Sequence, residues 1–170
     1  MLSNFISRRN FAARLAALFP GVGIAGMAAT SVDAQESSGV QKLDYEGKKA
    51  GTGFITPLII HNGVIYIAGQ GAHSHDSKAE FPKDIENHTT RVMDSVKTLV
   101  EAGGGTMDTI LQLTVYLTTI DSYDGMNKVF KTYFPNGGPA RTTVAVAALP
   151  GDSLVEINCT AAVVRSGKKG

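Results

Sequence analysis

The chain has one cysteine and no tryptophan among its 170 residues. A single cysteine, Cys159, excludes an intrachain disulfide, so stability must come from buried apolar side chains and from subunit contacts. Basic and acidic residues are nearly balanced, with 16 Lys and Arg against 15 Asp and Glu and a net charge of +1. This balance gives no electrostatic basis for binding nucleic acid. Neither a nucleophile elbow nor a phosphate loop occurs in the sequence.

The first 34 residues have the layout of a twin-arginine signal peptide. Ser7-Arg8-Arg9-Asn10-Phe11 precedes a modestly apolar stretch, which ends at Val32-Asp33-Ala34, a pattern typical of a cleavage site. A membrane anchor is the alternative, but a spanning helix needs about 20 strongly apolar residues, and Arg14 and Pro20 interrupt this stretch. We therefore expect export to the periplasm, with no stable membrane association after cleavage.

The rest of the chain is long enough for one domain with its own core. We predict a signal peptide over residues 1–34, an N-terminal lead-in with a short strand over 35–53, a single domain over 54–165 and a basic tail over 166–170.

Hydrophobic periodicity predicts the first elements of the domain. Two apolar runs, 58–60 and 64–68, are joined by His61-Asn62-Gly63, and Asn-Gly is a strong hairpin signal. Apolar residues then recur at helical spacing from Ile85 to Val100, before the glycines 103–105. These patterns indicate a hairpin followed by an amphipathic helix.

The second half of the domain continues the alternation of strand and helix. Residues 110–118 alternate as a strand does, and a helical stripe runs from Tyr123 to Phe134, with Asp121 in the position of an N-cap. Strands over 142–149 and 154–164 follow. This order predicts a mixed sheet with both helices on one face, and a semi-polar second face that commonly meets another subunit.

Arg141 is the leading candidate for ligand binding, because it begins a strand of small and apolar residues. We expect its guanidinium at the edge of the semi-polar face, where its planar fork would suit a carboxylate. The alternative is a strand-end arginine paired with a surface acid. If the last two strands form a hairpin, Glu156 pairs near Ala147, roughly 20 Å from Arg141 along the strand. The two could then share a pocket only across a subunit interface.

Other reactive residues have weaker patterns. His73 and His75 have the spacing of metal ligands, but a closed site needs at least one more ligand, and a solvated loop is the alternative. Cys159 shares the apolar parity of its strand, so we interpret it as a core residue rather than a nucleophile.

Several short motifs together resemble the RidA family, also called the YjgF or endoribonuclease L-PSP family. They cover most of residues 64–163 and are Ile67-Ala68-Gly69-Gln70, Val100-Glu101-Ala102-Gly103-Gly104, Thr114-Val115-Tyr116-Leu117, Asn127, and the run from Pro139 through Arg141 to Pro150 with Val155-Glu156-Ile157 after it. The resemblance implies a chorismate-mutase-like α+β fold with a six-stranded sheet, and a homotrimer with clefts between subunits.

The resemblance also implies an activity. Deaminase members of the family hydrolyse 2-aminoacrylate and related enamines or imines to 2-oxo acids and ammonia, without metal or cofactor. Arg141 matches the arginine that holds the substrate carboxylate, and Glu156 matches the glutamate thought to position or activate water. Gly69, Gln70 and Asn127 match further residues of the cleft.

Three expected cleft residues differ from the usual ones. Phe54 stands where a tyrosine is common, Ala68 where a serine is usual, and Thr143 where a cysteine is common. Two hydroxyls that could bond substrate or water are thus missing. The alternatives to a deaminase are a non-catalytic trimer that binds a small carboxylate or acts as a holdase, and a metal-binding module that uses His73 and His75.

Overall fold

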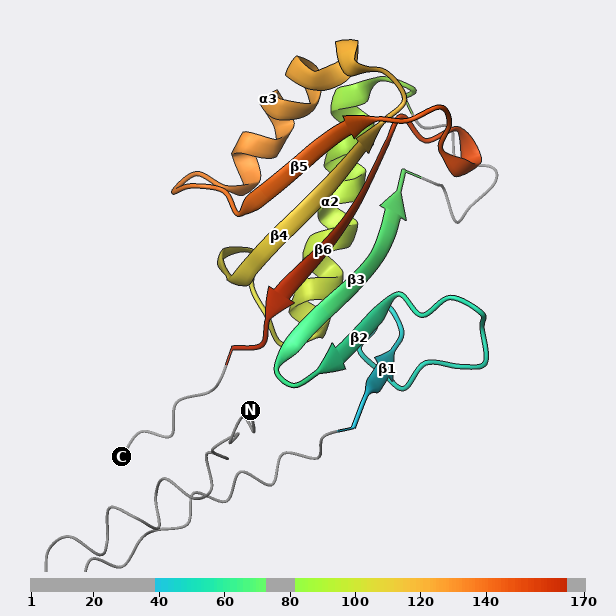
Figure 1. Cartoon of the computed structure of the whole chain (residues 1–170), viewed down its shortest axis with the longest axis vertical. Helices are drawn as coiled ribbons and strands as arrows, with labels where there is room; N and C mark the ends of the chain where they lie inside the picture. Colours follow the sequence, from blue (N-terminus) through green and yellow to red (C-terminus); the bar gives the residue numbers. More distant parts are fainter. Residues whose placement is uncertain (1–38, 73–81, 165–170) are drawn as a thin grey trace, which may run out of the picture. The chain divides into compact units, whose positions relative to one another are not determined.

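The computed structural model describes residues 39–72 and 82–164, which form a single mixed sheet with two α-helices (Figure 1). The strand order is β1-β2-β3-β6-β4-β5. The elements are β1 (Gln41–Leu43), β2 (Leu58–His61), β3 (Val64–Gly71), α2 (Ile85–Ala102), β4 (Ile110–Leu117), α3 (Tyr123–Tyr133), β5 (Ala140–Ala145) and β6 (Val155–Ala162). The predicted order of strands and helices is confirmed.

The β2–β3 hairpin has the tight turn that its sequence predicts. Asn62 and Gly63 both have positive φ, at 51° and 74°, as a two-residue turn of type I′ requires. The register sets Leu58 opposite Ile67 and Ile60 opposite Ile65. The hairpin therefore brings Leu58, Ile65 and Ile67, all buried, into the core.

Helix α2 is fixed at both ends and packs its apolar stripe on the sheet. The side chain of Asp84 accepts a hydrogen bond of 3.0 Å from the backbone N–H of Asn87, and this bond is the main reason why the pKa of Asp84 is lowered. Gly103 ends the helix. The stripe that faces the sheet is fully buried and comprises Val92, Met93, Val96, Leu99 and Val100.

Helix α3 connects two parallel neighbours, β4 and β5. Parallel strands need a long crossover, and the helix supplies it. The predicted N-cap is wrong: Ser122 holds that position without a side-chain bond, while the Thr119 hydroxyl accepts from the Asp121 N–H one turn earlier. A short 3-10 turn over Ile120–Ser122 precedes the helix, which moves the cap away from Asp121.

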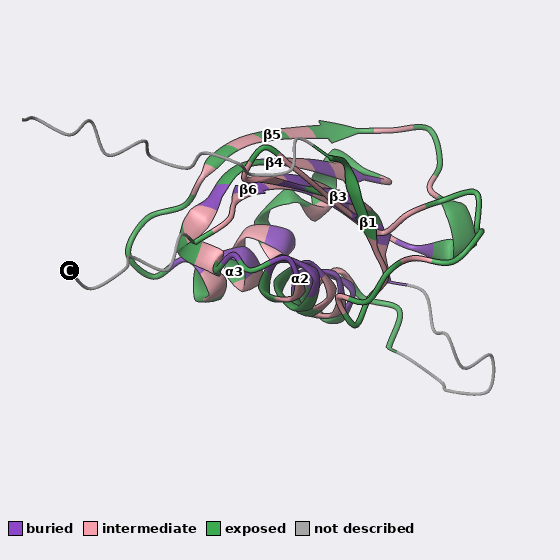
Figure 2. Cartoon of the chain, turned by 90° about the horizontal axis from the view of Figure 1, so that it is seen from below, coloured by how far each residue is buried: buried purple, intermediate pink, exposed green. Residues whose placement is uncertain are grey.

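The two faces of the sheet differ in composition, and both helices cover the same one (Figure 2). On β6, the buried residues Val155, Ile157, Cys159 and Ala161 face the helices, and Glu156, Asn158, Thr160 and Ala162 alternate with them on the other face. No described element covers that second face. Its semi-polar character is as predicted.

The predicted hairpin between the last two strands is wrong. Strand β4 lies between β5 and β6, parallel to the first and antiparallel to the second. Glu156 therefore pairs with Tyr116 on β4 instead of a residue near Ala147. The segment of residues 146–154, with a 3-10 turn at Pro150–Asp152, carries the chain past the end of β4.

Some predictions concern residues that the structure does not describe. The signal peptide over 1–34, His73, His75 and the basic tail over 166–170 lie outside the described residues. Within the residues that are described, neither helix has the length and apolar character needed to cross a bilayer.

Candidate functional site

Arg141 lies on the edge strand β5, and its side chain is on the helix-covered side of the sheet. It pairs with Leu113 of β4, which is completely buried against the helices, and paired residues point to the same face. The expectation that Arg141 lies on the semi-polar face is therefore wrong. Successive side chains of a strand point to opposite faces of the sheet, so the face of Arg141 depends on its position within the edge strand. The strand begins at Ala140, one residue before the arginine.

Three side chains of α3 surround the guanidinium of Arg141. Its Nη2 donates to the Tyr123 hydroxyl at 3.2 Å, and Nη1 lies 3.9 Å from the sulfur of Met126. The Phe130 ring lies beside the guanidinium carbon, with its centroid 4.6 Å away, a distance typical of a cation–π contact. These residues follow an i, i+3, i+7 spacing, so one face of α3 holds the arginine.

Arg141 forms no ion pair with a carboxylate within residues 39–72 and 82–164. The alternative of an arginine paired with a surface acid is therefore not what the described chain contains. The half-buried guanidinium is thus held at the edge of the sheet with no counterion in the described part of the chain. An anionic ligand would neutralise it through charge-assisted hydrogen bonds.

Asn127 belongs to the same group of residues. It lies on α3, one turn after Tyr123, and its side chain hydrogen-bonds the Tyr123 hydroxyl. This bond, followed by the positive charge of Arg141, lowers the pKa of Tyr123. The structure thus brings two of the predicted residues, Arg141 and Asn127, to one tyrosine.

Thr143 shares the face of Arg141, two residues further along β5. It pairs with the fully buried Val115, and its hydroxyl oxygen is buried with no hydrogen-bond partner among the described residues. Buried hydroxyls without a partner are uncommon, so this oxygen is a hydrogen-bonding group that the described chain leaves unused on the face of Arg141.

Glu156 lies beside an irregularity in β3. The pairing of β3 with β6 shifts between Ile67 and Gln70, and the Glu156 carboxylate lies over Gly69. A Cβ atom at Gly69 would come within 2.2 Å of the carboxylate oxygen, which shows how close the approach is. The side-chain amide of Gln70, which is buried, donates to the carbonyl oxygens of Ala68 and Gly69 at 2.8 and 3.2 Å. Four predicted residues therefore form a second group.

The side chains of Arg141 and Glu156 lie on opposite faces of one sheet. Arg141 shares the helix-covered face with its pairing partner Leu113. Glu156 pairs with Tyr116, which in turn pairs with Val144, and these three residues share the open face. Within a single chain the guanidinium and the carboxylate therefore point away from each other. Phe54 joins neither group, because it lies on the segment between β1 and β2 with its side chain fully exposed.

Two further predictions concern metal binding and the thiol. No group of three His, Cys, Asp or Glu residues able to hold a metal ion occurs in the described part of the chain, and His73 and His75 lie outside it. Cys159 is buried in the core, and burial raises its pKa to about 12. The interpretation of Cys159 as a core residue is confirmed, because such a thiol is a poor nucleophile.

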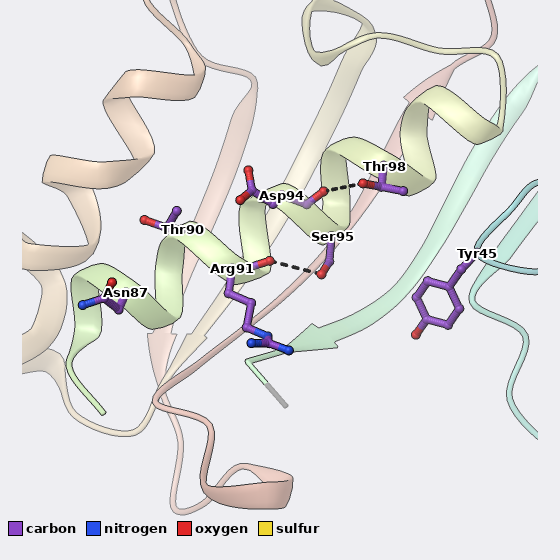
Figure 3. Close-up of a pocket in the computed structure, with 7 residues that line it drawn as sticks. All are labelled: Tyr45, Asn87, Thr90, Arg91, Asp94, Ser95 and Thr98. Atoms are coloured by element: carbon purple, nitrogen blue, oxygen red, sulfur yellow. Dashed lines mark hydrogen bonds between the residues drawn. The ribbon is translucent and has the colours of Figure 1, made fainter. Parts of the chain in front are cut away.

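A hollow of about 560 Å³ lies away from both groups, on the outer surface of α2 (Figure 3). Tyr45 lies across from helix side chains that include Arg91 and Asp94. The hydroxyls of Ser95 and Thr98 donate to backbone carbonyls four residues earlier, so they are already bonded. The outer face of α2 is therefore a solvated helix surface without a reactive cluster. A smaller hollow, of about 230 Å³, lies on the open sheet face between Tyr66, Gln112 and Asn158.

Sequence reasoning placed Tyr123 and Phe130 in the helical stripe from Tyr123 to Phe134 and missed their contacts with Arg141. Their spacing with Met126 was visible as part of the helical stripe. What the stripe could not reveal was that β5 lies beside α3 with the arginine turned toward it, because that depends on strand order.

Comparisons with known proteins bear on the fold and the family of the chain. The sequence profile described as endoribonuclease L-PSP matches residues 49–163. A RutC family protein of Saccharolobus solfataricus is 37% identical over 98 residues, which cover 58% of this chain and 78% of that protein.

Solved structures are also similar. A protein of Entamoeba histolytica described as an endoribonuclease L-PSP has a TM-score of 0.66 at 30% identity, and a Rid family protein of unknown function from Yersinia pestis has 0.65 at 31%. Each comparison covers 74% of this chain and 100% of the other.

Proposed function

Because this chain belongs to the endoribonuclease L-PSP family, also called the RidA or YjgF family, we propose that it is a hydrolytic deaminase of reactive enamines and imines. The substrates are small 2-amino acrylate-like acids, and the products are a 2-oxo acid and ammonia. The observation that carries the proposal is the guanidinium of Arg141, which α3 holds in place without a carboxylate partner in the described chain. Its role is to bind the substrate carboxylate.

The active unit is a homotrimer in which each cleft combines two chains. Arg141 and Glu156 lie on opposite faces within a chain, so a cleft that contains both needs Glu156 from a neighbouring subunit. The open sheet face supports such an assembly, because no described element covers its semi-polar side chains. Cleft sites between identical subunits follow naturally from cyclic symmetry.

Glu156 carries the proton transfers in this proposal. Its protonated form donates to the terminal carbon of the enamine, which becomes an iminium ion, and the resulting carboxylate accepts a proton from the water that adds to the iminium carbon. The same proton then passes to nitrogen, and ammonia leaves as the C–N bond breaks and the carbonyl forms. The hydroxyl proton returns to the Glu156 carboxylate, which restores the acid for the next turnover. One positioned acid–base group and one orienting cation are enough for this sequence, and no metal or cofactor takes part.

The test is ammonia release from 2-aminoacrylate generated in the assay. Wild-type protein should release ammonia faster than buffer, and Arg141→Ala should return the rate to that of buffer and abolish binding of pyruvate, a 2-oxo acid product. A wild-type rate equal to that of buffer would exclude the deaminase. Equal pyruvate affinity in wild type and Arg141→Ala would exclude the carboxylate site.

A non-catalytic trimer that binds small carboxylates is the second candidate. It is favoured by Ala68, which has no hydroxyl, and by Phe54, whose fully exposed ring contacts neither group. Pyruvate binding that depends on Arg141, together with no ammonia release above buffer, would identify this function.

The cellular location follows from residues 1–34, which we expect to direct the folded chain through the twin-arginine route to the periplasm. Fractionation of cells that express the full chain tests this expectation.

A further inference from the structure

The Tyr123 hydroxyl receives hydrogen bonds from two donors. Arg141 Nη2 lies 3.2 Å from its oxygen, and an arginine can only donate. The second donor is the side-chain amide of Asn127, whose bond lowers the pKa of Tyr123, as a bond that stabilises the phenolate does. Both groups act on the phenolic oxygen as donors.

The hydroxyl's own hydrogen has no acceptor among the described residues. A phenol is both donor and acceptor, and Tyr123 donates to none of the described side chains or carbonyls. The side chain is 39% exposed, so the hydroxyl lies at the rim of the site. One oxygen atom of a ligand could accept from Arg141 and from Tyr123 at once, because the two groups are in contact.

We propose that Tyr123 is a further ligand-binding residue, whose hydroxyl donates a hydrogen bond to the carboxylate that Arg141 holds. This inference rests on the proposed carboxylate site and adds a second donor to it. The carboxylate then has one charged partner and one neutral partner. Tyr123 contacts the ligand directly and also accepts a bond from Arg141.

The surroundings favour an anion of one negative charge. Among the residues that the structure describes, Arg141 is the only cation in contact with Tyr123, and the nearby carboxylate of Asp124 acts on the phenol with the opposite sign. A dianion such as phosphate would meet one guanidinium and the repulsion of Asp124. A carboxylate matches the single charge and the fork of the guanidinium.

The direction of the pKa shift supports a donor role. Asn127 and Arg141 stabilise the negative charge on the phenolic oxygen, and a phenol with a lowered pKa is a stronger hydrogen-bond donor.

Calorimetric titration with pyruvate tests the inference. Tyr123→Phe keeps the ring beside Arg141 and removes only the hydroxyl, and we expect its affinity to fall about tenfold or more, as for a lost hydrogen bond to a charged group. The matched control is Tyr133→Phe on the same helix, because its hydroxyl donates to Asp94 at 2.7 Å instead. The control should bind as wild type does.

The pH profile separates direct contact from a role in holding Arg141. As pH rises through the lowered pKa of Tyr123, the wild type should lose pyruvate affinity, because the phenolate cannot donate and repels the carboxylate. Tyr123→Phe, which keeps the neighbouring Arg141 and Asp124, should be unchanged over that range. A phenolate still accepts a hydrogen bond from Arg141. If Tyr123 only positioned Arg141, the pyruvate affinity of the wild type would therefore not change with pH over this range.

The outcomes also separate this inference from the proposed function. Wild-type affinity in Tyr123→Phe, with binding lost in Arg141→Ala, would overturn the role of Tyr123 and leave the carboxylate site intact. No difference between wild type and Arg141→Ala would overturn both.

Discussion

Arg141 and Glu156 are held in contrasting ways. Arg141 is surrounded by side chains of a helix, with an aromatic ring, a sulfur atom and a phenol in contact with its guanidinium. Glu156 lies over a glycine, beside backbone that is itself bonded by Gln70. The comparison teaches that side-chain packing fixes the cation, whereas the absence of a side chain makes room for the carboxylate. The two can therefore be disturbed separately.

Mixed oligomers give the largest expected effect. Arg141→Ala and Glu156→Gln should each lower activity at least about a hundredfold, as the loss of an acid–base group or anchor does. When the two variants are co-expressed with different tags and purified as mixed trimers, about one third of the clefts should combine an intact Arg141 with an intact Glu156. Ammonia release should recover to about that fraction. Mixed oligomers as inactive as the parents would contradict clefts shared between subunits.

Gly69→Ala tests the group around Glu156. The new methyl would overlap the end of a flexible side chain, so the fold should tolerate it while the carboxylate moves. Because misplacement of a reacting group by about 1 Å can cost up to a hundredfold, we expect kcat to fall roughly tenfold or more, with little change in Tm or in pyruvate affinity.

Gly51→Ala is the matched control, since nothing lies within 4 Å of a Cβ atom there. Unchanged kcat in Gly69→Ala would mean that the position of Glu156 over Gly69 does not matter for the reaction.

Phe130→Leu gives the smallest expected effect and tests the group around Arg141. It keeps an apolar side chain but removes the ring from the guanidinium, and such contacts contribute about 0.5–1 kcal/mol at partly exposed sites. We expect pyruvate to bind about threefold more weakly, as measured by calorimetry.

The control for this variant is Phe134→Leu. Its ring packs on Phe130 with centroids 4.8 Å apart and is buried to a similar degree, at 8% exposure against 7%. Thermal melts should therefore show similar destabilisation in both variants. Equal loss of affinity in the two would assign the effect to the helix as a whole instead of the cation–π contact.

Local patterns were sufficient to predict most elements of the fold. Asn62 and Gly63 predict their turn because few other residues accept positive φ, and the buried stripe of α2 is regular over its whole length. The grouping of Arg141 with Asn127 was implied only by the family resemblance. Their spacing along the chain contains no information about contact.

Strand order could not be predicted from neighbouring segments. A short turn at Pro150–Asp152 looks like a hairpin, but β4 carries large buried residues on alternate positions and takes the central place beside β6. Strand β5 has none of its residues buried, which is typical of an edge. The position of Arg141 within β5 and the strand that pairs with β5 together determine that the arginine faces α3. Because the predicted hairpin paired β5 with β6 instead of β4, the prediction put the arginine on the wrong face.

The burial of Cys159 has a consequence for how the molecule responds to oxidants. Its thiol lies within β6, the strand that joins β3 to β4, and it is 5% exposed with a pKa raised to about 12. Burial and the raised pKa both keep the sulfur in its unreactive thiol form while β6 stays paired. Alkylation of this sulfur should therefore be slow in the folded chain and faster when the centre of the sheet opens, so its rate reports the local stability of that region.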